Sequence, residues 1–273
     1  GVLILRRAIR ATPETTAQEL MHAEVVTTQA HDPAEEAART MARYGFYALP
    51  VLDPRGRMVG LFTGDDAQTV LREAETEDVL ALGAVSGDAE AYMSLSVFKL
   101  YRRRIVWLLA LFLAETLTGA VMRHYGGDGT IPAYMFFLPL IIGAGGNAGS
   151  QATTMITRSL AIGEIDSRDW LIIFRKEFIT ALLVGGSLGL IGILRAAAWG
   201  ASPNLMISVG AALPTVVIWA TAVGGLLPLA ARRLRIDPAV MSAPFISTFV
   251  DATGLMIYFE IVKAAFGGKL PIG

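Results

Sequence analysis

The stretch LIIGAGGNAGSQ, residues 140–151, follows a proline and combines four glycines with two uncharged amides. Missing side chains favour either close packing against another helix or an unwound backbone whose carbonyls face a lumen. Asn147 and Gln151 lie one turn apart on one face, where their amide oxygens can accept hydrogen bonds from metal-bound water. Helix packing alone accounts for Gly145 and Gly149, but it leaves the two amides unexplained.

The composition of the chain indicates a membrane protein. Of its 273 residues, 53% are hydrophobic and 17% are charged, with a mean hydropathy of +0.52, which is too apolar for a soluble domain of this length. Residues 1–95 carry 15 acids against 8 Lys and Arg, whereas residues 96–273 carry 9 against 15, so the two parts are expected to meet different solvents. The absence of cysteine excludes disulfides and thiolate metal sites.

Five apolar stretches occupy the second part. Each supplies roughly the 20 residues that a helix needs to cross the hydrocarbon core, and five crossings place the two termini on opposite sides. The predicted spans are about 105–122, 131–157, 178–194, 205–231 and 239–262.

Basic residues are divided unequally between the two ends of these spans. Lysine and arginine favour the cytoplasmic side. The richer side has Lys99, Arg102, Arg103, Arg104, Arg158, Arg168, Arg175, Lys176, Arg232, Arg233 and Arg235, and the other has Arg123, Arg195, Lys263 and Lys269. The N-terminal module is therefore expected in the cytoplasm and the C-terminus outside, with short external turns at YGGDGTIP and AWGASPN.

The N-terminal part is predicted to be a small α/β unit. Its apolar residues with helical spacing are Ala34, Ala37, Ala38 and Met41. ALPVLD (48–53) and MVGLFT (58–63) are strand-like, and DPRG (53–56) is a hairpin turn between them. GVLILRRAI at residue 1 resembles GLFTGDDAQ at residue 60, as the ends of two copies of one module would. The first copy is cut, and two explanations stay open: the chain is part of a longer protein, or the natural protein is a shortened member of its family.

Acidic residues crowd the end of this module. Residues 65–90 contain Asp65, Asp66, Glu73, Glu75, Glu77, Asp78, Asp88 and Glu90. Such a run is usually a solvated helix face. The alternative is a regulatory cation site, because the run precedes the first span and carboxylate oxygens bind hard divalent cations.

Three carboxylates fall inside the predicted spans, where each costs about 3 kcal/mol to bury: Glu115, Asp251 and Glu260. Asp251 is the most informative, because Arg235 and Lys263 are the nearest bases in the chain and are too distant for an intrahelical salt bridge. Ser247 shares its helix face, and with Thr248 it gives an oxygen-lined stripe. The alternative is a protonated Asp251 that hydrogen-bonds to a neighbouring helix.

The other two carboxylates admit simpler roles. Glu115 lies beside Thr116 and Thr118, a pattern that suits hydrogen bonding between helices. Glu260 lies near the external end of its span, where it can reach the headgroups and pair with Lys263.

A pore with such oxygens suits a small divalent cation. Potassium requires rings of carbonyls and full dehydration, whereas Mg²⁺ keeps its waters and is held through them by one or two carboxylates. One aspartate per chain is too few for a site. Two chains about a two-fold axis would bring two Asp251 carboxylates together, with a dication between them to relieve their repulsion.

The motifs of both parts resemble known families. YALPVLD and GLFTGDD resemble a CBS module. In that family Thr63 and Asp66 would contact the phosphates and ribose of a nucleotide, and the alternative for Asp66 is a helix N-cap. PLIIGAGGNAGSQATTMITRSLAIGEI, DWLIIFRKEF and GGLLPLAARRLRIDPAVMSAPFISTFVDATGLMIYF, in this order, resemble the MgtE family of magnesium transporters.

The second resemblance covers nearly the whole chain. It implies a homodimeric, Mg²⁺-selective channel with five membrane helices per subunit, a pore on the dimer axis, and a cytosolic CBS region that closes the pore when internal Mg²⁺ is plentiful. It assigns the pore carboxylate to Asp251, a carbonyl-contributing position to Ser247 and the Gly-Gly-Asn asparagine to Asn147. Further pore-lining candidates are Thr248, Gln151, Gly146, Ala243 and Glu115. The regulatory metal candidates are Asp65, Asp88, Glu90 and Asp237, and the nucleotide candidates are Thr63 and Asp66.

Two positions depart from the family pattern. Ala243 stands where many relatives have an asparagine, which removes an amide able to touch the hydrated ion, so looser selectivity is expected. Ser86 stands where relatives place an acid at the start of the linker, with Asp88 and Glu90 nearby but out of register. Regulation is therefore expected to differ more than permeation.

The expected fold is an α-helical membrane protein, with five transmembrane helices preceded by a small α/β cytosolic CBS-type module. Its expected parts are the tail of a truncated first CBS module (1–20), a CBS module (21–80), a linker with an amphipathic plug helix (81–103) and a five-helix pore domain (104–273).

The expected function is transport of Mg²⁺ into the cytoplasm across a bacterial inner membrane. Membrane lipid and, at the CBS module, ATP are further expected ligands, whereas no enzymatic step and no nucleic-acid partner is expected. Two alternatives stay open. One is a proton-coupled transporter of Co²⁺ or Mn²⁺ that uses Asp251 and Glu115 as titrating carriers, and the other is a non-transporting CBS-type membrane sensor.

Overall fold

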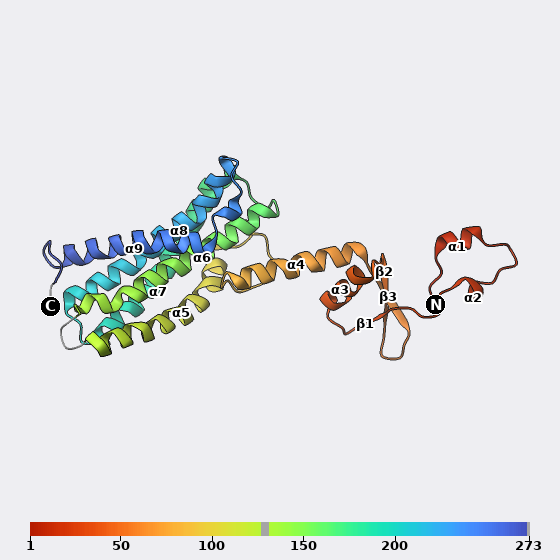
Figure 1. The fold of residues 1–273 in the computed structure, drawn as a ribbon, viewed down its shortest axis with the longest axis horizontal. Coiled ribbons are helices and arrows are strands. Elements are labelled where there is room, and N and C mark those ends of the chain that lie inside the picture. The colour runs from red at the N-terminus through yellow and green to blue at the C-terminus, as the bar shows by residue number, and fades with distance from the viewer. Residues whose placement is uncertain (127–130, 272–273) are drawn as a thin grey trace. The chain divides into compact units, whose positions relative to one another are not determined.

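The computed structural model describes residues 1–126 and 131–271 and divides into two compact units, Gly1–Glu75 and Thr76–Gly273 (Figure 1). Each unit has a hydrophobic core of its own. Helix α4 (Gly64–Leu82) begins in the first unit and ends in the second.

The first unit is a small α/β fold, as the sequence predicts. Its elements before α4 are α1 (Leu5–Arg10), α2 (Ala17–Leu20), β1 (Thr28–Gln29), α3 (Ala34–Tyr44), β2 (Ala48–Leu52) and β3 (Met58–Thr63). The strands form one sheet of order β1-β2-β3, in which β1 pairs parallel to β2 and β2 pairs antiparallel to β3. The predicted order of helix, strand, turn, strand and helix is confirmed, and the two-residue strand β1 is an addition.

The hairpin between β2 and β3 turns at the predicted DPRG motif. Asp53 Oδ1 accepts hydrogen bonds from the backbone N–H groups of Arg55 and Arg57, each at 2.9 Å. Gly56 has the left-handed backbone that the turn requires, with φ of 73°. The core beneath the hairpin is small and consists of Ala37, Ala38, Met41, Leu49 and Ala67.

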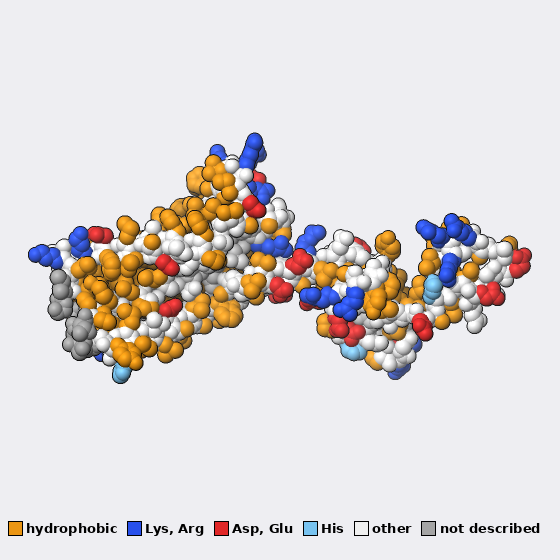
Figure 2. Space-filling model, viewed as in Figure 1, with side chains coloured by type: hydrophobic (Ala, Val, Ile, Leu, Met, Phe, Trp, Pro, Cys, Tyr) orange, Lys and Arg blue, Asp and Glu red, His pale blue; other side chains and the backbone are white. Residues whose placement is uncertain are grey.

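The second unit is a bundle of long helices. Its elements after α4 are α5 (Val97–Gly126), η1 (Ala133–Phe137), α6 (Leu138–Ala161), η2 (Ser167–Asp169), α7 (Trp170–Ala198), α8 (Pro203–Arg233), η3 (Pro238–Val240) and α9 (Ala243–Ala265). Four segments within the described residues are long and apolar enough to cross a membrane, namely α5, η2 with α7, α8 and α9. Figure 2 shows hydrophobic side chains over much of the visible surface of this unit, as lipid contact requires.

Helix α6 is the fifth helix of the predicted bundle, and it is not among the four segments that are apolar enough by composition to cross a membrane. It packs against α5, α8 and α9 and buries most of its residues. A helix enclosed by other helices does not need a lipid-soluble surface, so that glycines and amides are tolerated along it. The helix is continuous through the glycine-rich stretch, and the predicted alternative of an unwound backbone does not occur.

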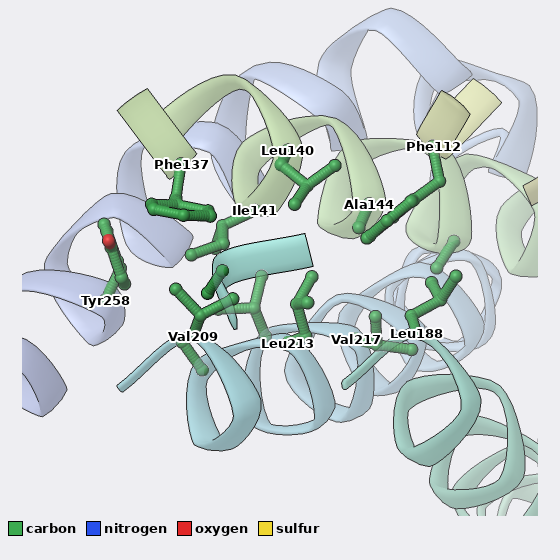
Figure 3. Packing of buried hydrophobic residues seen from close by; sticks show 14 of the residues in the cluster. Phe112, Phe137, Leu140, Ile141, Ala144, Leu188, Val209, Leu213, Val217 and Tyr258 are labelled. Carbon is green, nitrogen blue, oxygen red and sulfur yellow. The ribbon is translucent and has the colours of Figure 1, made fainter. Parts of the chain in front are cut away.

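Close helix packing surrounds α6. A Cβ atom on Gly145 would lie 2.6 Å from Cγ1 of Val216, and one on Gly224 would lie 2.3 Å from the carbonyl oxygen of Gly149. The hydroxyl of Thr153 donates to the carbonyl oxygen of Gly224 at 3.0 Å and so joins α6 to α8. The largest buried cluster continues around these contacts, and Figure 3 shows Leu140 and Ile141 of α6 beside Val209 and Leu213 of α8.

The plug helix predicted within residues 81–103 is not formed as one helix. Helix α4 ends at Leu82 and α5 begins at Val97, and the residues between them are irregular. The backbone turns at Ala84, with φ of 55°, and at Gly87, with φ of 115°, and neither conformation is helical. The backbone N–H of Ser86 then bonds to the carbonyl oxygen of Arg103 at 3.0 Å, which folds the linker back onto α5.

The starts of several predicted spans are shifted. Helix α5 begins at Val97 rather than at residue 105, and α7 begins at Trp170 rather than at residue 178. The second span begins with η1 at Ala133 and continues as α6, and α9 begins at Ala243 rather than at residue 239. Of the external turn YGGDGTIP, residues 127–130 lie outside the described residues.

Candidate functional site

Helix α9 carries the predicted pore carboxylate on its half-buried side. Its buried residues are Ile246, Val250, Gly254, Tyr258 and Val262, which recur every four residues. Ser247 and Asp251 each lie one position further along the chain, so that their side chains flank this buried stripe and are half-buried. The burial of the apolar stripe against α6 and α8 thus fixes the direction of the polar pair.

Helix α6 approaches the polar pair through Gly146. A Cβ atom on Gly146 would lie 2.8 Å from Oγ of Ser247 and 3.1 Å from Oδ1 of Asp251. The missing side chain therefore leaves the space that these oxygens occupy. Glycine also removes bulk at Gly143, where a Cβ atom would lie 2.9 Å from Oε1 of Glu115 on α5. The glycines of α6 thus lie on two faces of the helix. Gly145 and Gly149 allow close contact with α8 and α9, whereas Gly143 and Gly146 leave space for the carboxylates of Glu115 and Asp251.

These side chains share one cavity, of about 380 Å³, between α5, α6 and α9. It is lined by Glu115, Met122, Leu138, Pro139, Ile142, Gly143, Gly146, Asn147, Ser247 and Asp251. Five of the predicted site residues therefore come together from three helices: Glu115, Gly146, Asn147, Ser247 and Asp251. The apolar lining residues and Pro139 were not predicted, because nothing in a sequence distinguishes them from lipid-facing neighbours.

The polar groups of this cavity have few partners of their own. Within the described residues, the carboxylates of Glu115 and Asp251 form no ion pair, and the Asn147 amide and Ser247 hydroxyl form no side-chain hydrogen bond. Glu260, in contrast, is exposed and pairs with Lys263 at 3.6 Å, as the sequence suggests. Apart from the thioether of Met122, the groups that the cavity offers to a cation are oxygens, which suit a hard divalent ion.

The carboxylates of one chain do not form a typical metal site. Among the described residues, no group of three or more His, Cys, Asp or Glu side chains is close enough to hold a metal ion. Two carboxylates with neutral oxygens instead match an ion that keeps much of its water shell. The cavity is lined by α5, α6 and α9 and is open to the surface of the chain.

Three predicted pore-lining residues lie outside this cavity. The buried side chain of Gln151 donates from Nε2 to the carbonyl oxygen of Ala84 at 2.6 Å, so that it joins α6 to the linker. Thr248 is exposed, and its hydroxyl donates to the carbonyl oxygen of Pro244 on its own helix at 2.9 Å. Ala243 lies at the start of α9, where its carbonyl oxygen accepts a long hydrogen bond from Ser150 at 3.4 Å.

The nucleotide candidates lie at the start of α4. Asp66 Oδ2 accepts hydrogen bonds from the backbone N–H of Thr63 at 3.0 Å and from its hydroxyl at 2.6 Å. Asp65 Oδ1 also lies within hydrogen-bonding distance of this hydroxyl, and that contact lowers the pKa of the Asp65 carboxyl. Thr63 therefore occupies the N-cap position of α4, and Asp66, the third residue of the helix, stabilises the helix start by accepting from Thr63. The predicted alternative thus occurs in a modified form, and nucleotide binding stays a prediction.

The regulatory candidates of the second unit are not grouped. Asp88 is exposed in the linker, and Asp237 caps η3 by accepting from the backbone N–H of Ala239 at 2.9 Å. Glu90 pairs with Lys99 at 2.5 Å and with Arg103 at 3.4 Å. The hydrogen bond from Lys99 lowers the pKa of Glu90, so that a cation at this carboxylate would compete with two bases.

A buried polar network beneath the linker was missed by the sequence analysis. The guanidinium of Arg104 on α5 donates to both oxygens of Glu177 on α7, at 2.6 and 2.8 Å. The hydroxyl of Tyr92 donates to Oε1 of Glu177 at 2.8 Å, and burial raises the pKa of this tyrosine well above its ordinary value. Lys176 donates to the carbonyl oxygen of Tyr92 at 2.8 Å.

The reason for the omission is the position of the third span. A span that begins at residue 178 leaves Glu177 in solvent, whereas α7 begins at Trp170 and encloses it. The signal available in the sequence was the length of the apolar stretch that begins at Trp170 and continues through the charged group RKE.

Comparison with known proteins follows this division of the chain. A family model for MgtE, described as a divalent cation transporter, matches residues 138–261, and a CBS domain model matches residues 17–73. The first match covers α6 to α8 and most of α9, and with them Asn147, Ser247 and Asp251.

Several curated relatives align with nearly the whole chain. A protein named Magnesium transporter MgtE from Thermus thermophilus is 38% identical over 264 residues, which are 96% of this chain and 58% of the relative. A protein of the same name from Bacillus subtilis is 30% identical over 269 residues, 97% of this chain and 58% of the relative. The chain thus spans 58% of the length of each of these relatives. With a CBS domain ahead of the helices that match the transporter model, the chain belongs to the MgtE family.

Proposed function

We propose that the chain moves hydrated Mg²⁺ across the membrane into the cytoplasm as a selective channel or transporter. The observation that carries this proposal is the cavity in which the carboxylates of Asp251 and Glu115 lie together with neutral oxygen-bearing side chains. Among the described residues, no lysine or arginine forms an ion pair with either carboxylate. The names of the relatives support the choice of ion, because each is called a magnesium transporter.

The passage is proposed to lie on the axis of a homodimer. The cavity lacks a wall and holds two carboxylates, so that a second copy related by two-fold symmetry would both close it and double its charge. Two Asp251 carboxylates that face one another repel, and a dication between them removes this cost. Mg²⁺ that keeps its waters would meet Asn147 and Ser247 through those waters.

The membrane potential is the proposed driving force. A potential that is negative inside favours entry by about 2.3 kcal/mol per charge per 100 mV. A dication therefore gains about 4.6 kcal/mol per 100 mV, and no enzymatic step is required.

Regulation by internal Mg²⁺ is proposed to act through the acidic residues around the linker. Asp65, Asp88, Glu90 and Asp237 are the candidates. At Glu90, Mg²⁺ would have to replace Lys99 and Arg103, and this exchange would release the linker from α5. ATP is proposed as a ligand of the CBS domain at Thr63 and Asp66.

The test is cation flux into proteoliposomes that contain the full chain. We expect Asp251→Asn to reduce Mg²⁺ uptake to the level of empty liposomes, because it removes the carboxylate that faces the ion. Glu260→Gln is the matched control on the same helix and should leave uptake unchanged, since Glu260 is exposed and lines no part of the cavity. Normal uptake by a correctly inserted Asp251→Asn protein would refute the proposal.

The same liposomes separate the alternatives. Flux of Co²⁺ or Mn²⁺ that follows an imposed pH gradient would favour the proton-coupled transporter, in which Glu115 and Asp251 carry protons. No flux of any divalent ion at any pH would favour the membrane sensor.

A further inference from the structure

A second cavity, of about 210 Å³, opens between the start of α7 and the end of α8. It is lined by Ser167, Trp170, Leu226, Leu229, Ala230 and Arg233. It shares no residue with the cavity that contains Glu115 and Asp251. Because α7 begins at Trp170 and α8 ends at Arg233, the cavity lies at the membrane face that is rich in arginine and is predicted to be cytoplasmic.

The rim of this cavity carries two donor groups that the protein does not use. Within the described residues, neither the indole N–H of Trp170 nor the guanidinium of Arg233 has a hydrogen bond or ion pair. The neighbouring Arg232 behaves differently, because its Nη1 donates to the carbonyl oxygen of Leu160 at 2.7 Å. Arg232 therefore joins α6 to α8, whereas Arg233 is exposed at the rim of the cavity.

The floor of the cavity is apolar. Leu229 is 3% exposed and Leu226 packs against the same buried cluster, so that α8 presents a firm hydrocarbon surface below the two donors. Leu229 lies one helix turn before Arg233 on α8. A ligand that fits must therefore carry a hydrogen-bond acceptor for Arg233 and an apolar chain that reaches Leu229. A tryptophan and an arginine at the edge of the hydrocarbon core are also typical of the headgroup region.

The acids next to the cavity restrict the charge of this ligand. Asp166 Oδ1 accepts from the backbone N–H of Arg168 and the hydroxyl of Ser167, at 3.1 and 3.2 Å, and Asp169 Oδ2 accepts from the backbone N–H of Asp166 at 2.9 Å. The hydrogen bonds from Arg168 and Ser167 lower the pKa of the Asp166 carboxyl, so that it stays ionised beside the rim. A phosphodiester with one negative charge is repelled less by such neighbours than a free phosphate with nearly two.

We propose that this cavity binds one phospholipid of the adjoining leaflet, with its phosphate at Arg233 and Trp170 and an acyl chain on Leu226 and Leu229. The guanidinium offers paired donors to two phosphate oxygens, and the indole N–H adds a third. The site is independent of ion permeation and would hold α7 against α8 at this membrane face.

The test is lipid retention by the purified full chain in detergent, measured by native mass spectrometry during titration with phosphatidylethanolamine and phosphatidylglycerol. We expect Arg233→Gln to weaken the tightest lipid about tenfold, which corresponds to about 1.4 kcal/mol. Trp170→Phe keeps the ring and loses only the N–H, and we expect about a threefold loss. Arg175→Gln is the matched control, because Arg175 is exposed on α7 and does not line the cavity, and it should stay within twofold of the wild type.

Other outcomes would overturn the proposal. Equal lipid affinity in Arg233→Gln and Arg175→Gln would show that Arg233 does not hold the phosphate. Displacement of the lipid by soluble glycerophosphate at millimolar concentration would show that the apolar floor contributes nothing. If Arg233→Gln separated a dimer and left lipid retention unchanged, the surface would belong to a second copy. If Arg233→Gln fails to fold, Arg233→Lys replaces it, because lysine keeps the charge and loses the paired donors. The lipid affinity of Arg233→Lys must then be lower than that of the wild type, and an unchanged affinity would overturn the proposal.

Discussion

Substitution of Gly146 by alanine tests whether α6 leaves room for the oxygens of α9. The added methyl group would lie 2.8 Å from Oγ of Ser247 and 3.1 Å from Oδ1 of Asp251. Both distances are shorter than the optimal contact of about 3.5 Å. We therefore expect the methyl group to displace both oxygens or to push α9 away from α6.

The magnitude follows from two opposing terms. Alanine in place of glycine inside a helix stabilises it by about 0.5–1 kcal/mol, whereas overpacking costs about 1–3 kcal/mol. Gly186→Ala on α7 is the matched control, because a Cβ atom there meets nothing within 4 Å. The helix-propensity term is common to both variants, so the difference in their free energies of unfolding should equal the overpacking cost alone, about 1–3 kcal/mol.

The assay has two parts on the same preparations. Unfolding of the purified chain in detergent gives the stability difference, and Mg²⁺ uptake into liposomes gives the effect on permeation. We expect Gly146→Ala to be less stable than Gly186→Ala and to take up Mg²⁺ more slowly. Equal stability and equal uptake in the two variants would mean that Ser247 and Asp251 do not depend on the missing side chain of α6.

Two further predictions concern the charged groups beneath the linker. Glu177→Gln should destabilise the chain by about 3–5 kcal/mol, since it leaves the buried guanidinium of Arg104 without its carboxylate, and a double variant Arg104→Met/Glu177→Leu should recover most of this loss in the same unfolding assay. For Glu90, the folded-state pKa lies below its ordinary value of 4.5, so its contribution to stability is present above pH 4.5 and is lost as the pH falls through the folded-state pKa. The melting temperatures of wild type and Glu90→Gln should therefore converge in acid and in high salt, and a gap that persists in both would contradict the pairing with Lys99.

The sequence was sufficient where local patterns dictate the structure. The DPRG turn and the helical spacing of Ala37, Ala38 and Met41 depend on neighbours in the chain, and both occur as predicted. The position of Ser247 and Asp251 on one helix face follows from helical periodicity alone, and both side chains line the cavity.

The sequence was insufficient where partners are distant in the chain. Nothing local distinguishes Gln151 from Asn147, yet Gln151 reaches the carbonyl oxygen of Ala84 while Asn147 lines the cavity. The same is true of Glu177, whose partners lie on α5 and in the linker. The irregular linker was also missed, because the left-handed backbone lies at Ala84 and not at a glycine, and the carbonyl oxygen of Ala84 accepts a hydrogen bond from the distant Gln151 on α6.

The most direct test of the central claim is a structure of the full chain with Mn²⁺ in place of Mg²⁺, in which anomalous scattering locates the ion. The proposal predicts one peak on a two-fold axis between the Asp251 carboxylates of two subunits, at a distance that leaves room for bound water. A peak that avoids Asp251, or a carboxylate that faces lipid away from any second subunit, would contradict it.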